Sequence, residues 1–296
     1  MRGARLPRKP GLGAWSHNLI LIVASLVGIM AFVYPFFQGV SPSTMALPRE
    51  AATNQAHAQD APLITIVLIT LCLGAVMATM GTGQMNSKMV AILGVLTASN
   101  AVLRAVPGPA GFAAVFVLPI LCGYTYGSTF GFLLGALSLL VSALIGAGVG
   151  PWVPYQMFAV GWVGLTSAWL PDMRRWPRGE VIVLGLWGLF WGFVFGALMN
   201  IWFWPYVYQP QQAEMYWEPG MRLREALKRY AAFYGLTSIW WDLGRAGGNA
   251  LLTWLFGAAL LKLLRRFQKR FHFAVAPTPS DEGERSLRTS DGQQTA

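Results

Sequence analysis

Charged residues are scarce in this chain, and one long stretch has none. Asp, Glu, Lys and Arg make up 11% of the 296 residues, whereas soluble domains carry about 25%. Between Arg104 and Asp172 there is no charged residue at all, and glycine and proline interrupt the gap. Such a stretch excludes both a water-exposed domain and a single helix. It predicts several membrane-spanning helices joined by tight turns.

Cysteine and histidine are also scarce. Cys72 and Cys122 both lie within apolar runs, so neither a disulfide framework nor a metal site is predicted. His17, His57 and His272 lie singly at segment edges, where we expect surface residues rather than ligands. The chain has no GxxxxGK[ST], HExxH or Gly-x-Ser-x-Gly motif, so we expect no cofactor and no ATP site of its own.

Apolar segments fill most of the chain, and glycine, proline and charged residues separate them. They predict an all-α integral membrane protein with about eight transmembrane helices. The fourth segment is short for a full span, which suggests that it is tilted or packed among its neighbours. The eight segments cover residues 18–37, 62–80, 87–105, 112–123, 127–148, 154–170, 181–204 and 236–264.

Basic residues form three blocks: at the N-terminus, after the sixth segment and after the eighth. With eight spans the three blocks share one side, which the positive-inside rule makes cytoplasmic. This placement explains the net charge of +10 without a nucleic-acid partner. We expect a multi-pass protein of the cell membrane with cytoplasmic termini. Its predicted parts are a basic N-terminus (1–17), two helices with an outer loop (18–86), a membrane core (87–270) and a disordered tail (271–296).

A long outer link covers residues 205–235. Within it, apolar residues recur every three to four positions between Met221 and Tyr234. This pattern predicts an amphipathic surface helix or lid, and a solvated connector is the alternative.

Small residues form stripes on two predicted helices, and such stripes let another helix approach closely in a membrane. In segment 127–148, Gly127, Gly131 and Gly135 are spaced by four, and there we favour packing inside the bundle. In segment 87–105, spacings of three and four place five small residues on one face. This face fits either internal packing or a partner surface. Its residues are Ala91, Gly94, Ala98, Ala101 and Ala105.

Polar residues inside apolar segments are costly, so their positions are informative. In the eight-span arrangement several gather near the outer ends, and aromatic residues lie at the same depth. An outward-facing pocket with apolar and aromatic walls explains both sets. The alternatives are a structural Asp242–Arg245 ion pair and an interfacial belt of tryptophans. The candidate substrate-binding residues are Asn100, Arg104, Trp152, Tyr155, Gln156, Asn200, Trp202, Trp241, Asp242, Arg245 and Asn249.

Three patterns occur together between residues 88 and 164: the small-residue helix, GYxxGxxFGFxxG and GPWxPxQM. With them this stretch resembles the substrate-binding S component of energy-coupling factor (ECF) transporters. The resemblance extends over about segments three to eight, the six-helix core of that family. Here two extra helices precede the core, and the outer link is longer than usual.

The resemblance implies a substrate-capture subunit of an ATP-driven vitamin or micronutrient importer, not an enzyme. Such a subunit works with a transmembrane T component and two ABC-type ATPases. The family's first core helix faces the T component, and Gly94–Ala98 and Ala101–Ala105 match its small-residue pairs. The loop 106–111 occupies the place of a ligand cap. An aromatic-rich pocket under a long outer loop favours a bulky cargo such as cobalamin.

Two other functions remain open. One is a membrane-embedded enzyme that uses Asp242 and Arg245 on a lipid-linked substrate. The other is a non-transporting scaffold whose small-residue face recruits partner helices.

Overall fold

The computed structural model describes residues 13–37, 56–105, 108 and 112–271. The predicted basic N-terminus up to residue 12, most of the loop 106–111 and the predicted tail from residue 272 lie outside these residues. The described part is helical and contains no strands. The prediction of an all-helical membrane protein is therefore confirmed for this part of the chain.

A helix overlaps each of the eight predicted segments, and α10 begins within the link 205–235, but the count of eight membrane spans stays a prediction. Six helical stretches of the described chain are long and apolar enough to cross a membrane, whereas α6 and α8 are shorter. The helices are α1 (Gly13–Val33), α4 (Ala61–Gly81), α5 (Ser87–Ala105), α6 (Val117–Tyr126), α7 (Ser128–Ser142), α8 (Val153–Ser167), α9 (Pro177–Phe203), α10 (Leu223–Thr237) and α11 (Ile239–Phe271).

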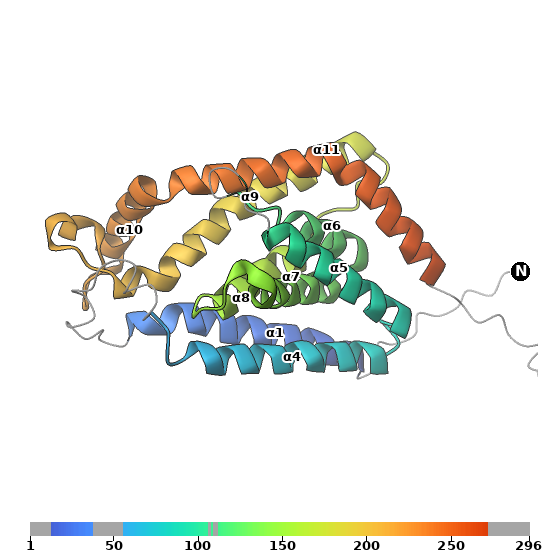
Figure 1. Cartoon of the computed structure of the whole chain (residues 1–296), viewed down its shortest axis with the longest axis horizontal. Helices are drawn as coiled ribbons and strands as arrows, with labels where there is room; N and C mark the ends of the chain where they lie inside the picture. The colour runs from blue at the N-terminus through green and yellow to red at the C-terminus, as the bar shows by residue number, and fades with distance from the viewer. Residues whose placement is uncertain (1–12, 38–55, 106–107, 109–111, 272–296) are drawn as a thin grey trace, which may run out of the picture.

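The helices form three groups, which Figure 1 shows from one side. The short helices α6, α7 and α8 lie in the middle. The pair α9 and α11 covers one side of them, and the pair α1 and α4 covers the other. Helix α5 packs against α7, and α10 lies at one end of the bundle, beside the beginning of α11. Helix α6 is buried over most of its length, as its short apolar segment suggested.

Glycines let α7 and α8 pack backbone to backbone. A Cβ atom added at Gly131 would lie 2.3 Å from the Gly164 carbonyl oxygen, and one at Gly135 would lie 2.2 Å from that of Val160. Internal packing is therefore the role of these two glycines. Gly127 differs from them, because its φ of 100° makes it the turn between α6 and α7.

Helix α10 confirms the predicted amphipathic helix in the outer link. Phe233 is buried against the bundle, and the Tyr230 hydroxyl donates to the Ala197 carbonyl of α9 at 2.6 Å. On its other face Leu223 and Leu227 are exposed. An exposed leucine face beside a membrane bundle is typical of a helix that lies in the membrane interface.

Candidate functional site

Two polar side chains of α5 point into the bundle one turn apart. The Asn100 Nδ2 donates to Ser138 Oγ of α7 at 2.8 Å. The Arg104 guanidinium donates to Ser142 Oγ at 2.9 Å and to Gln156 Oε1 of α8 at 2.5 Å. These two predicted pocket residues thus meet the polar residues of two neighbouring helices.

A second amide, Asn249 of α11, reaches the same region from the opposite side. Its Oδ1 accepts from the Phe116 backbone N–H at 3.1 Å, and its Nδ2 donates to the Ala113 carbonyl at 3.0 Å. The Asn100 Nδ2 also donates to the Val115 carbonyl at 3.1 Å. The two amides therefore hold the chain that enters α6 between α5 and α11. We call Asn100, Arg104, Ser138, Ser142, Gln156 and Asn249 the polar layer.

The polar layer has unused binding capacity. Within the described part of the chain, Arg104 has no carboxylate within ion-pair distance; its partners are the neutral Ser142 and Gln156. The Oδ1 of Asn100 is buried and accepts no hydrogen bond from the described residues. A half-buried cation without a counter-charge attracts an anionic or strongly accepting group.

The predicted Asp242–Arg245 ion pair is present on α11, with Nη1 and Oδ1 2.5 Å apart. The Arg245 guanidinium also lies over the Phe195 ring, 5.0 Å from its centroid. Phe195 in turn packs on Phe116, whose N–H is held by Asn249. The pair is therefore contiguous with the polar layer.

Asn200 lies elsewhere on α9. Its Oδ1 accepts from Ser238 at the beginning of α11 at 3.0 Å, so it joins the link between α10 and α11 to α9. Its Nδ2 is buried without a partner among the described residues.

The prediction that His57 is a surface residue is wrong, because only 2% of it is exposed. Its Nε2 donates to the Trp202 carbonyl at 2.9 Å, and its Nδ1 lies 2.8 Å from Asp60 Oδ2. The hydroxyls of Tyr34 and Tyr155 donate to the same carboxylate oxygen at 2.5 and 2.9 Å. These hydrogen bonds join the turn before α4 to α1, α8 and α9.

The hydrogen bonds around His57 and Asp60 involve two of the predicted pocket residues, Tyr155 and Trp202. Tyr155 and the backbone of Trp202 attach the N-terminal helices to the core, while Gln156, the next residue of α8, faces Arg104.

Burial raises the pKa of Asp60, but the three hydrogen bonds to its carboxylate outweigh burial and hold that pKa below its usual value.

Trp241 does not lie with the other predicted pocket residues. It is 57% exposed, because neighbours on a helix point about 100° apart and Asp242 faces α9. Trp152 is half-buried and packs at the edge of the core. The tryptophan-belt alternative therefore fits Trp241 better than a pocket does.

The small-residue face of α5 is partly accessible. Ala91, Gly94 and Ala98 are exposed, and a Cβ atom added at Gly94 would meet no atom within 4 Å. Ala105 is half-buried, and Ala101 is fully buried. Ala101 lies one residue from the inward-pointing Asn100, so it is not part of the accessible face.

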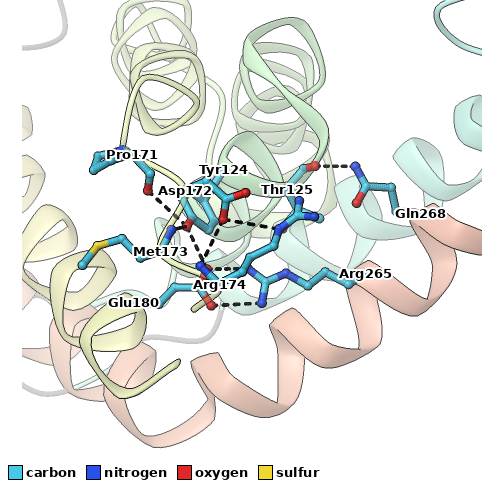
Figure 2. Close-up of polar contacts among 9 residues, drawn as sticks. All are labelled: Tyr124, Thr125, Pro171, Asp172, Met173, Arg174, Glu180, Arg265 and Gln268. Carbon is cyan, nitrogen blue, oxygen red and sulfur yellow. Dashed lines mark hydrogen bonds and ion pairs between the residues drawn. The ribbon is translucent and has the colours of Figure 1, made fainter. Parts of the chain in front are cut away.

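Sequence reasoning missed an ion pair at the other end of the bundle, which Figure 2 shows. Glu180, only 2% exposed in the first turn of α9, accepts from Arg265 Nη1 at 2.9 Å and from the Tyr124 hydroxyl at 2.7 Å. The Gln268 side chain donates to the Thr125 carbonyl close by. A single acidic residue at the start of an apolar helix was the available signal.

Comparison with known proteins identifies a family. The family described as "ECF transporter, substrate-specific component" matches residues 88–257, more than half of the chain. The matched part begins in α5, contains the whole polar layer and leaves α1 and α4 outside. No match is found among curated proteins or among solved structures. The family consists of transporter components rather than enzymes, and this multi-pass membrane chain belongs to it as a substrate-specific component of an ECF transporter.

Proposed function

We propose that this protein captures a vitamin or similar micronutrient at the polar layer for an ATP-driven importer. The observation that carries the proposal is Arg104, which is held between Ser142 and Gln156 with no counter-charge among the described residues. A cation without a counter-charge in an apolar bundle costs free energy, and such residues in membrane proteins usually serve a function. Binding of an acceptor group from a ligand provides one.

The surroundings of Arg104 indicate the chemistry of the ligand. Arg104 and the free Oδ1 of Asn100 favour a molecule that carries both an anionic or accepting group and a donor. The buried rings of Phe116 and Phe195 pack on each other, and Phe116 adjoins the layer through Asn249. A bulky cargo such as cobalamin remains our proposal, supported by the long link that carries α10.

The chain entering α6 is proposed to close over the ligand. Asn100 and Asn249 hold its backbone from two helices, so the capping segment has a defined resting position. Loss of these hydrogen bonds would let the segment move away from the site. A cap of this kind would exclude water and lengthen the residence time of the ligand.

Basic residues support an outward-facing site. The link between α8 and α9, which carries Arg174 and Arg175, and the basic last turns of α11 lie at the end of the bundle away from α10 (Figure 1). If that end is cytoplasmic, as the positive-inside rule indicates, the polar layer opens toward the outside. Both termini would then be cytoplasmic.

We further propose that α5 couples the protein to a T component, which works with two ABC-type ATPases. Ala91, Gly94 and Ala98 leave a smooth exposed face on which a second helix can approach closely. Among the described residues, no atom lies within 4 Å of a Cβ added at Gly94, so this position leaves room for a partner helix.

The capture proposal is tested by identifying the molecule retained on purification and measuring its affinity for variants. Arg104→Gln should weaken binding by about ten- to a hundredfold, because a hydrogen bond to a charged group contributes about 1.5–3 kcal/mol. Arg175→Gln, at an exposed position between α8 and α9, is the matched control and should bind normally. Equal affinity of the Arg104→Gln and unmodified proteins would refute a site at the polar layer.

A further inference from the structure

A cavity of about 600 Å³ lies between the first turns of α9 and the last turns of α11. It is separate from the polar layer, since Asn249 precedes Lys262 by 13 residues, or about 20 Å along α11. This cavity adjoins the Glu180–Arg265 ion pair in Figure 2. The proposed capture of substrate at the polar layer does not involve this cavity.

The cavity has a strong excess of positive charge. One face of α11 contributes five basic side chains, and α9 contributes one carboxylate, Glu180. That carboxylate is already bound by Arg265 and Tyr124. The other four basic side chains are exposed and have no carboxylate partner among the described residues: Lys262, Arg266, Lys269 and Arg270.

Part of the cavity wall is apolar. Val181 of α9 and Ala258 and Leu261 of α11 form it. On α11 the exposed Leu255 lies one turn before Ala258, so apolar surface extends along this helix toward the middle of the bundle. An anionic head group and a hydrocarbon chain would therefore find complementary surfaces in succession along the same two helices.

We propose that this cavity binds a phosphate-bearing anionic lipid. The head group lies among Lys262, Arg266 and Lys269, and an acyl chain follows the apolar wall past Ala258. Basic pockets between transmembrane helices on the cytoplasmic side are suited to such head groups. No described side chain caps the N-terminus of α9, so the helix dipole adds to the positive field there. Free phosphate shares the head-group chemistry, but it gains no favourable contact with the apolar wall.

The test is native mass spectrometry of the full chain in neutral detergent. The probes are phosphatidylglycerol, phosphatidylcholine with the same acyl chains, and inorganic phosphate. We expect phosphatidylglycerol to bind preferentially. Its affinity should fall about 25-fold in Lys262→Gln/Lys269→Gln, since each basic residue near an anionic head group accounts for a factor of about five.

The matched control is Arg175→Gln/Arg178→Gln, which removes the same charge from exposed positions outside the cavity. Its affinity for phosphatidylglycerol should stay within about twofold of that of the unmodified chain. An equal loss in both double variants would indicate diffuse attraction and overturn the site. Equal binding of both lipids would overturn an anionic lipid site. If inorganic phosphate binds as tightly as phosphatidylglycerol, the lipid proposal is overturned and the site binds a free anion.

Discussion

Gly135 provides a sharp test of how α7 and α8 are packed. In Gly135→Ala the new Cβ would lie 2.2 Å from the Val160 carbonyl oxygen and 2.9 Å from the Gly161 nitrogen. The shorter distance is about 1.2 Å less than the 3.4 Å at which ordinary contacts begin. Because both of these neighbours are backbone atoms, the helices must move apart rather than a side chain turn away.

The expected change is a loss of stability of about 1–2 kcal/mol. Overpacking of this kind costs about 1–3 kcal/mol, and replacing a helical glycine by alanine recovers at most about 0.5–1 kcal/mol. Ser142 of α7 and Gln156 of α8 both accept hydrogen bonds from the Arg104 guanidinium, and wider separation of the two helices would move them apart. Ligand affinity should therefore fall with stability.

The assay is unfolding by sodium dodecyl sulfate, followed by tryptophan fluorescence. Gly94→Ala is the control, because it makes the same replacement within a helix but meets no atom within 4 Å. It should leave the free energy of unfolding unchanged or raise it by up to about 1 kcal/mol. A Gly135→Ala protein as stable as the unmodified chain would refute the close packing of the two helices.

Three further predictions concern coupling, the capping segment and acid stability. Ala98→Leu should abolish co-purification with a T component while ligand affinity is unchanged; normal assembly would exclude this face as the coupling surface. Asn249→Leu leaves the Ala113 carbonyl and the Phe116 N–H unsatisfied, so thermal unfolding should show a loss of about 1–3 kcal/mol, and an unchanged midpoint would contradict it. Folding lowers the pKa of Asp60, so the ionised carboxylate stabilises the fold fully above about pH 4, and this stabilisation is lost as pH falls through the folded pKa. Asp60→Asn should therefore flatten the acid dependence of the unfolding midpoint. An unaltered pH profile would exclude Asp60 as the source of that dependence.

Local pattern was enough to predict the helices and their composition. Long apolar segments without charge can satisfy their backbone in a membrane only as helices, so a helix overlaps each of the eight predicted segments, although individual helix ends differ from the predicted ones by up to seven residues. The three- and four-residue spacing on α5 separated its small-residue face from Asn100 and Arg104. The same patterns carried the family resemblance that the match over residues 88–257 confirms.

Contacts between distant segments needed the tertiary structure. His57 stands in a polar stretch, and only packing against Trp202 and Tyr155 shows that it is buried. Periodicity placed Ala101 on the stripe with Ala98, but the position of α7 decides that Ala101 is covered and Ala98 is free.

The sequence by itself determined the class of protein, its helices and the residue types available for binding, because these depend on short-range spacing and on transfer from water to lipid. The tertiary structure decided that Asn100 and Asn249 hold the same segment of chain before α6 and that Glu180 pairs with Arg265. These partners are far apart in the chain, so the packing of whole helices brings them together, and no local pattern encodes that packing.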